Sequence, residues 1–149
     1  MDHVSDELVR IVDSAEPVFR QVSEEDGGKP VLAGGWSRKQ VLGHLIDSAS
    51  NNHQRFVRAA LADSLDFPAY DTPGCVVVQA VDSASWGMLV DLWVSYNRYL
   101  AHVIRRLPAA KLGVPCRVGS HAPVRLAYLV EDYVRHLVHH LDQIGAAGS

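Results

Sequence analysis

The segment LVEDYVRHLVHHLDQI, residues 129–144, is apolar on nearly every side when it is wound as a helix at about 100° per residue. A helix that is apolar nearly all round is buried in a bundle rather than lying on a surface. Four polar side chains nevertheless form a stripe along it: Asp132, His136, His140 and Gln143. Buried polar groups need partners. The stripe therefore predicts either polar contacts from another helix or a bound ion.

The histidines of this helix have a spacing that suits a metal ion. His136 and His140 are one turn apart and about 40° apart around the axis, so both imidazoles can reach one ion. His139 points about 60° to the other side of His136 and is a poorer partner. The HxxxH spacing alone also fits two partly exposed histidines, and that alternative stays open. Leu137 stands where a zinc metalloprotease of the HExxH type needs glutamate, which excludes that chemistry.

Helical periodicity extends outward from this segment to three further stretches. The first covers residues 5–22. The second is capped by Ser37 with Gln40 three residues on, a capping box, and extends to about Ala62. The third begins near Ser83 or Ser85 and ends before Pro108, and the last is expected to run from about Pro123 to a C-terminal glycine, Gly145.

Two irregular connections separate the later helices. Residues 64–83 form a long crossover between the second and third helices, in which CVVVQ (75–79) is predicted as loop or a short extended piece without a partner. Residues 107–124 form the other. Because no strand pattern is long enough to build a sheet, we predict one domain over residues 1–149, an all-α four-helix bundle. The long crossover predicts a topology other than simple up-down-up-down.

Composition narrows the class of protein. The 149 residues include 14 Lys and Arg against 17 Asp and Glu, and the basic residues are scattered, which argues against nucleic-acid binding. No apolar run approaches the roughly 20 residues of a membrane span. The start of the sequence, MDHVSDELVR, lacks the features of a signal peptide, so we expect a cytoplasmic protein. Cys75 and Cys116 are expected as free thiols.

The second helix also has a polar side, which carries a further histidine. Gln40, Asp47, Ser48, Asn51 and Arg55 share the side of His44. An ordinary solvent face is one explanation. The set is rich in short hydroxyl and amide groups rather than in Lys and Glu, however, and this suits a lined pocket.

Two stretches together, GGWSRKQVLGHLIDSASNNHQRF and LVEDYVRHLVHHLDQI, resemble the DinB superfamily, the DinB/YfiT-like metalloenzymes, and in particular its DinB-like branch. The likeness covers nearly the whole chain in order: a tryptophan before a capped helix, a histidine about two turns in, and a terminal HxxxH helix. It implies a four-helix bundle, a divalent metal held by His44, His136 and His140, and a homodimer.

Three neutral histidine ligands leave a position open on the ion, as in catalytic rather than structural zinc sites. We expect zinc or nickel. Asp47 and Asp132 are candidates to hold the histidines from behind, and the candidate pocket-lining residues are Ser48, Asn51, Arg55 and Gln143.

The resemblance implies an enzyme that transfers a low-molecular-weight thiol, acting as cofactor, to a small electrophilic substrate. Two alternatives stay open. One is a metal-dependent hydrolase that uses a metal-bound water. The other is a non-catalytic stress protein that binds a metal or ligand. A carboxylate one water away from the metal would favour hydrolysis.

Overall fold

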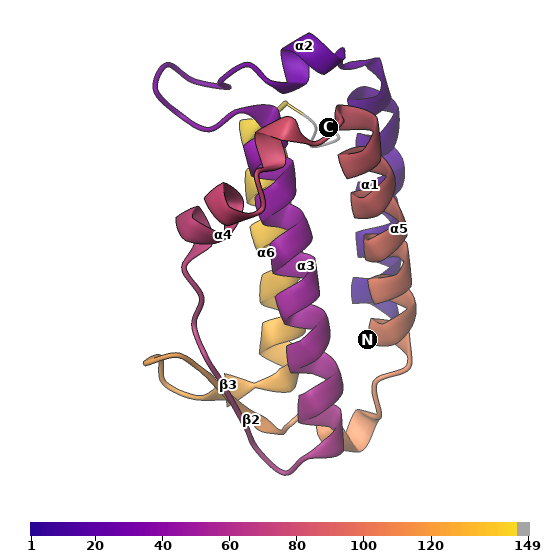
Figure 1. Cartoon of the computed structure of the whole chain (residues 1–149). Coiled ribbons are helices and arrows are strands. Elements are labelled where there is room, and N and C mark those ends of the chain that lie inside the picture. Colours follow the sequence, from indigo (N-terminus) through magenta and orange to yellow (C-terminus); the bar gives the residue numbers. More distant parts are fainter. Residues whose placement is uncertain (146–149) are drawn as a thin grey trace.

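Four long helices form the body of the protein in a computed structural model that describes residues 1–145 (Figure 1). They are α1 (Asp2–Gln21), α3 (Arg38–Leu61), α5 (Trp86–Arg105) and α6 (Leu126–Gln143). Short helices lie in the connections: α2 (Glu24–Gly27), α4 (Thr72–Val78), and the 3₁₀ turns η1 (Val81–Ser83) and η2 (Ala109–Lys111). The predicted four-helix bundle is confirmed.

The order of the helices around the bundle is α1, α5, α3, α6, so α1 and α3, which are consecutive long helices, stand diagonally. In Figure 1, α1 and α6 run upward while α3 and α5 both run downward. Because α3 and α5 are parallel neighbours, the chain between them must return along the full length of the bundle. This return is the long crossover that the sequence predicts, and the topology is not simple up-down-up-down.

Local signals explain where α3 and α5 begin. The Ser37 hydroxyl accepts a hydrogen bond from the Gln40 backbone N–H (3.1 Å), and the Gln40 side chain accepts one from the Ser37 N–H (2.9 Å). Ser85 caps α5 by accepting from the Met88 N–H. Each cap satisfies donors that the first helical turn leaves unpaired, and the predicted capping box is confirmed.

The stretch CVVVQ was predicted as loop or extended chain, and that prediction is wrong: most of it lies in α4. Asp71 caps this helix by accepting from the Gly74 N–H (3.1 Å), and Pro73 occupies its first turn, where a proline costs nothing. Val76 is buried against the bundle. These tertiary and capping contacts outweigh the preference of valine for strands.

Three short strands also depart from the expectation of no sheet. They are β1 (Leu65–Phe67), β2 (Pro115–Val118) and β3 (Val124–Arg125). Strand β2 pairs in parallel with β1 and in antiparallel with β3. Because Val124 and Arg125 are used by the sheet, α6 begins at Leu126 and not near Pro123. The predicted C-terminal glycine is present, with Gly145 at φ 71° just past the helix.

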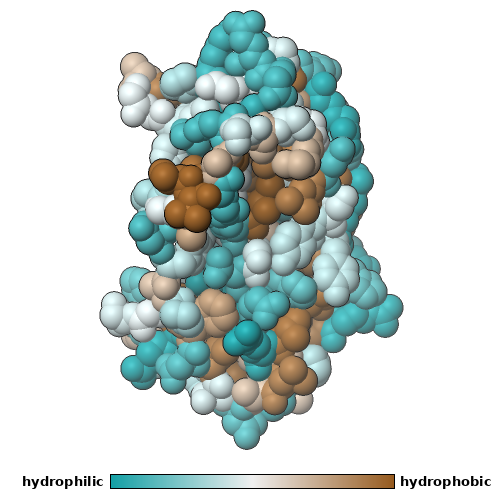
Figure 2. Space-filling model, in the orientation of Figure 1, coloured by the Kyte–Doolittle hydropathy of each residue, from teal (hydrophilic) through white to brown (hydrophobic). Residues whose placement is uncertain are grey.

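Both cysteines are free thiols, as the sequence predicts. Cys75 and Cys116 are both free, and Cys116 is buried in β2. Figure 2 shows an apolar cluster on the face that carries α4, where Val77 and Val78 are 75% and 85% exposed. No helix within residues 1–145 combines the length and the apolar character that crossing a bilayer requires.

The end of the crossover is attached to the first turns of α3. Asp82 in η1 accepts hydrogen bonds from the Ser37 hydroxyl (3.0 Å) and the Gln40 amide (2.9 Å). Val81 lies against Gly43, so closely that a Cβ placed on the glycine would stand 2.6 Å from a Val81 methyl. Gly43 therefore lets the crossover pack on α3 beside His44.

We predict that Gly43→Ala destabilises the protein, although Gly→Ala inside a helix ordinarily stabilises by about 1 kcal/mol. Overpacking against the stiff Val81 side chain costs about 1–3 kcal/mol, so the net free energy of unfolding should fall. Urea unfolding of metal-free protein measures it. Gly87→Ala is the matched control, because a Cβ there meets nothing within 4 Å and should stabilise or be neutral. A stabilised Gly43→Ala would contradict the close packing.

Candidate metal centre

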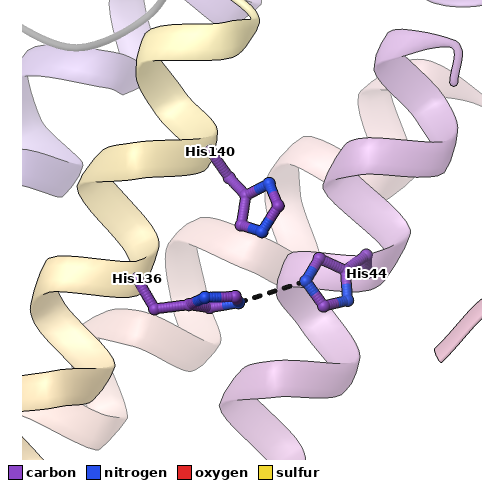
Figure 3. A group of neighbouring side chains, drawn as sticks. All are labelled: His44, His136 and His140. Atoms are coloured by element: carbon purple, nitrogen blue, oxygen red, sulfur yellow. Dashed lines mark hydrogen bonds between the residues drawn. The ribbon is translucent and has the colours of Figure 1, made fainter. Parts of the chain in front are cut away.

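Three histidines from two helices meet between α3 and α6. His44 comes from α3, and His136 and His140 come from adjacent turns of α6, with all three rings directed into the same space (Figure 3). The Nε2 atoms of His44 and His136 are 3.1 Å apart. One ring nitrogen from each of the three lies within 4.8 Å of the others. The structure thus brings together the three residues that the sequence proposed as ligands.

The donor set fits a divalent ion. Two nitrogens bound to one tetrahedral zinc at about 2.0–2.1 Å stand roughly 3.3 Å apart, close to the His44–His136 separation. No other group of three or more His, Cys, Asp or Glu residues within the described part of the chain converges in this way. Three imidazoles and no carboxylate or thiolate make a neutral site, and imidazole is a ligand for zinc, nickel, iron and copper alike.

All three imidazoles favour the neutral form that a metal requires. Burial, followed by the neighbouring His140 and His136, lowers the pKa of His44 from 6.5 to about 4. Burial also lowers the pKa of His136, with Asp132 acting in the opposite direction. Burial lowers the pKa of His140 in turn. Because protons compete poorly for these rings near neutral pH, their lone pairs are free to bind a cation.

A glutamine sets the tautomer of His140. Gln143 Oε1 lies 2.8 Å from His140 Nδ1 and can only accept, so Nδ1 carries the proton and Nε2 is left free as a ligand. The Gln143 amide nitrogen then donates to His139 Nε2 (3.1 Å). Gln143, predicted as a pocket-lining residue, thus orients a candidate ligand. His139 is exposed, and Gln143 forms hydrogen bonds with both His139 and His140.

The contacts that orient the His44 ring differ from those that the sequence predicts. Asp47, a candidate to hold His44 from behind, instead accepts two hydrogen bonds of 2.9 Å from the Gln79 amide at the end of α4. His44 Nδ1 is buried and has no hydrogen-bond partner among residues 1–145. The ring is packed edge-on against Trp36, with centroids 5.7 Å apart. Packing, rather than a carboxylate, orients His44.

A polar cavity of about 210 Å³ opens beside the triad. Its wall includes His44, His136, Asp132 and two of the predicted lining residues, Ser48 and Arg55. Asp132, the other residue expected to hold a histidine from behind, instead forms an ion pair with Arg135 at 3.0 Å and is half exposed in this wall. The cavity therefore places one carboxylate beside the histidines.

Some of the lining differs from the prediction. Asn51 donates to the Asp47 carbonyl oxygen (3.0 Å) instead of lining the cavity, and the neighbouring Asn52 takes that place. Gln143 lines a separate apolar hollow beside Trp36. Tyr70 and Thr72 from the crossover complete the wall. No sequence signal placed these two, because their position depends on how the crossover folds back over α3.

The other histidines lie away from the triad. His53 faces α5, where its Nδ1 is 3.2 Å from the Tyr96 hydroxyl. His3, His102 and His121 are exposed.

The chain belongs to the DinB superfamily, whose sequence profile matches residues 7–144. A protein of Bacillus pumilus that is provisionally assigned as a metal-dependent hydrolase is 26% identical over 141 residues, which cover 93% of this chain and 79% of that protein. The solved structure of YfiT from Bacillus subtilis, described in the same provisional way and as an unusual four-helix bundle, superposes with a TM-score of 0.81. That alignment covers 95% of this chain and 83% of YfiT at 19% identity, and it shows the shared fold.

We predict that Gln143→Leu weakens zinc binding by about tenfold, because His140 loses the acceptor that sets its tautomer. Competition with a chromogenic chelator measures the affinity. Gln54→Leu is the control, since Gln54 lies on the exposed side of α3 and its side chain accepts a hydrogen bond from Arg58, away from the triad. Equal affinities for both variants would show that the glutamine does not orient the ligand.

We predict that metal-free protein loses stability as the pH falls from 7 to 5. The unfolded chain protonates His44 near pH 6.5, whereas the folded protein holds it neutral down to about pH 4. Above pH 6.5 both states are neutral and the term vanishes. His44 alone should lower the free energy of unfolding by about 2 kcal/mol over this range.

Urea unfolding of chelator-treated protein at both pH values tests this. His44→Gln should flatten the difference between the two pH values relative to the wild type. His3→Gln removes an exposed histidine and serves as the control. An unchanged pH dependence in His44→Gln would refute a buried neutral imidazole.

Proposed function

We propose that this protein is a divalent-metal-dependent hydrolase of small molecules. The observation that carries the proposal is the convergence of His44, His136 and His140 at the edge of a cavity whose wall contains Asp132. Three neutral ligands leave an open coordination position, as catalytic sites require. The provisional assignments of the Bacillus relatives point the same way.

The residues around the cavity would have different roles in hydrolysis. The three histidines would hold the ion, which when bound supplies a Lewis acid that lowers the pKa of water to about 7. Asp132 would accept a proton from a water in the cavity, since its carboxylate shares the wall with His136. Ser48, Asn52 and Tyr70 offer hydrogen bonds that orient a bound molecule. The buried apolar helices behind the site exclude bulk water.

Thiol transfer remains the competing enzyme function. It would use the same ion to hold a low-molecular-weight thiol as thiolate and would need no carboxylate base. The half-exposed Asp132 in the cavity wall is the observation that favours hydrolysis. The homodimer and the cytoplasmic location implied above stay predictions, and sedimentation analysis tests the first.

We predict that protein purified without an affinity tag or added metal contains about one divalent ion per chain, measured by elemental analysis. His44→Ala, His136→Ala and His140→Ala should each lose most of it, because two imidazoles hold the ion far less tightly than three. His102→Ala is the control, an exposed histidine on α5. Full metal content in all three triad variants would overturn the metal site.

Activity separates hydrolysis from thiol transfer. Zinc- and nickel-loaded protein would be assayed on a panel of small esters and amides, and in parallel on electrophiles with added thiols. Asp132→Asn should lower hydrolysis by about 10²-fold or more while leaving the metal content unchanged. Turnover that requires a thiol and tolerates Asp132→Asn would instead support the transferase.

A further inference from the structure

Arg55 is a partly buried cation without an anionic partner. Among residues 1–145 no carboxylate oxygen lies within the 4.0 Å ion-pair distance of its guanidinium, although eleven such pairs link other side chains. Its Nε is buried and has no acceptor in this part of the chain. Its only hydrogen bond to the described residues is a long one, from Nη1 to Asn52 Oδ1 at 3.4 Å. Desolvating a charge in this way is costly unless something compensates it.

The neighbouring carboxylates are already engaged elsewhere. Asp132, in the wall of the same cavity, pairs with Arg135, and Asp47 accepts from Gln79. Asp66, near Arg55 in sequence, pairs with Arg117 across the small sheet. Burial accordingly lowers the pKa of the Arg55 guanidinium. The described chain therefore supplies no counter-ion.

Helix geometry directs Arg55 towards the histidines. It follows His44 by eleven residues on α3, close to three full turns, so both side chains project from the same face. Side chains on a helix lean towards its N-terminus, and the contact with Asn52 places the guanidinium one turn nearer to His44. Arg55 and the triad residues His44 and His136 line one cavity.

The residues around the Arg55 guanidinium hold it in place and include both polar and apolar side chains. Its carbon lies 5.2 Å from the centre of the Phe67 ring, a cation–π contact. Tyr70 and Asn52 add polar groups, while Leu129 and Tyr133 add apolar wall. Tyr133 is itself locked by donating its hydroxyl to Asn97 of α5. The arrangement is preorganised, so a ligand pays little to order it.

We propose that Arg55 binds the carboxylate of a small monoanionic substrate whose body extends through the cavity to the histidine triad. This inference rests on the proposed function, because it names the substrate class of the same site. A single guanidinium matches the charge and the planar shape of one carboxylate through a forked pair of hydrogen bonds. A phosphate dianion would call for more positive charge than Arg55 alone supplies at its end of the cavity.

The test uses binding as well as turnover. The probes are 4-phenylbutanoate and its neutral counterpart 4-phenylbutanamide, titrated into metal-free and zinc-loaded protein. Binding is followed by calorimetry and by the Arg55 Nε–H signal in ¹⁵N NMR. The carboxylate should bind at least tenfold more tightly than the amide, and this preference should appear in metal-free protein too, because it resides in Arg55.

Substitutions at Arg55 test whether this residue causes the preference for the carboxylate over the amide. Arg55→Gln should abolish the discrimination without lowering the melting temperature, since it removes a charge that no described residue compensates. Arg55→Lys should recover part of it by keeping the charge. Arg58→Gln is the matched control: Arg58 also stacks near Phe67, at 5.9 Å, but is exposed and does not line the cavity.

Several outcomes would overturn the proposal. Equal binding of acid and amide, tighter binding of inorganic phosphate than of the carboxylate, or equal losses in Arg55→Gln and Arg58→Gln would each do so. Unfolding of both Arg55 variants would show a structural role instead. None of these depends on metal content, so a chain that binds its ion and hydrolyses esters but binds acid and amide equally would refute the inference while the proposed function stands.

Discussion

The close approach of α3 to α6 is the constraint on which the rest of the site depends. It takes His44 out of water, leaving it 5% exposed, and brings its Nε2 to 3.1 Å from that of His136. Two imidazoles at this distance cannot both be charged, and burial adds to the penalty, so the rings stay neutral. At this distance one neutral ring can donate its N–H to the other, and the same two nitrogens are close enough to share a cation instead. The approach that closes the bundle thus also sets the spacing of the three candidate ligands.

The connectivity of the bundle decides what surrounds the histidine triad. Because α3 and α5 are parallel neighbours, the chain between them must climb back along α3, and it is anchored there by Val81 on Gly43 and by Asp82 on the α3 cap. On the way it lays Tyr70 and Thr72 over the cavity. A simple up-down bundle would have a short turn in this place and an open groove. The crossover thus adds a wall to the cavity at the helix–helix interface.

Groups of opposite charge lie at different places along the cavity. The triad can hold a cation at one end, Asp132 supplies a carboxylate beside it, and Arg55 presents an uncompensated positive charge further along α3. Cations separated by about two helical turns and by low-dielectric walls still repel one another. A ligand with a negative group at the Arg55 end relieves that repulsion. Binding of the ion and of an anionic molecule would then favour each other.

The sequence by itself determined the four-helix bundle, the capping box at Ser37 and Gln40, the long crossover and the three histidines that belong together. Each of these features depends on helical periodicity or on the short motifs that carry the family resemblance. Such signals can be read from the amino-acid sequence without knowledge of the tertiary contacts. The helix at Thr72–Val78 has a local signal in its Asp71 cap and Pro73, which the strand preference of valine masked. Only the tertiary structure decided the short sheet that delays α6 to Leu126 and the lining by Asn52 and Tyr70. It also sent Asp47 to Gln79 instead of His44. These features depend on which surfaces meet after the chain turns back, where burial and long-range hydrogen bonds outweigh the local preferences of valine and proline.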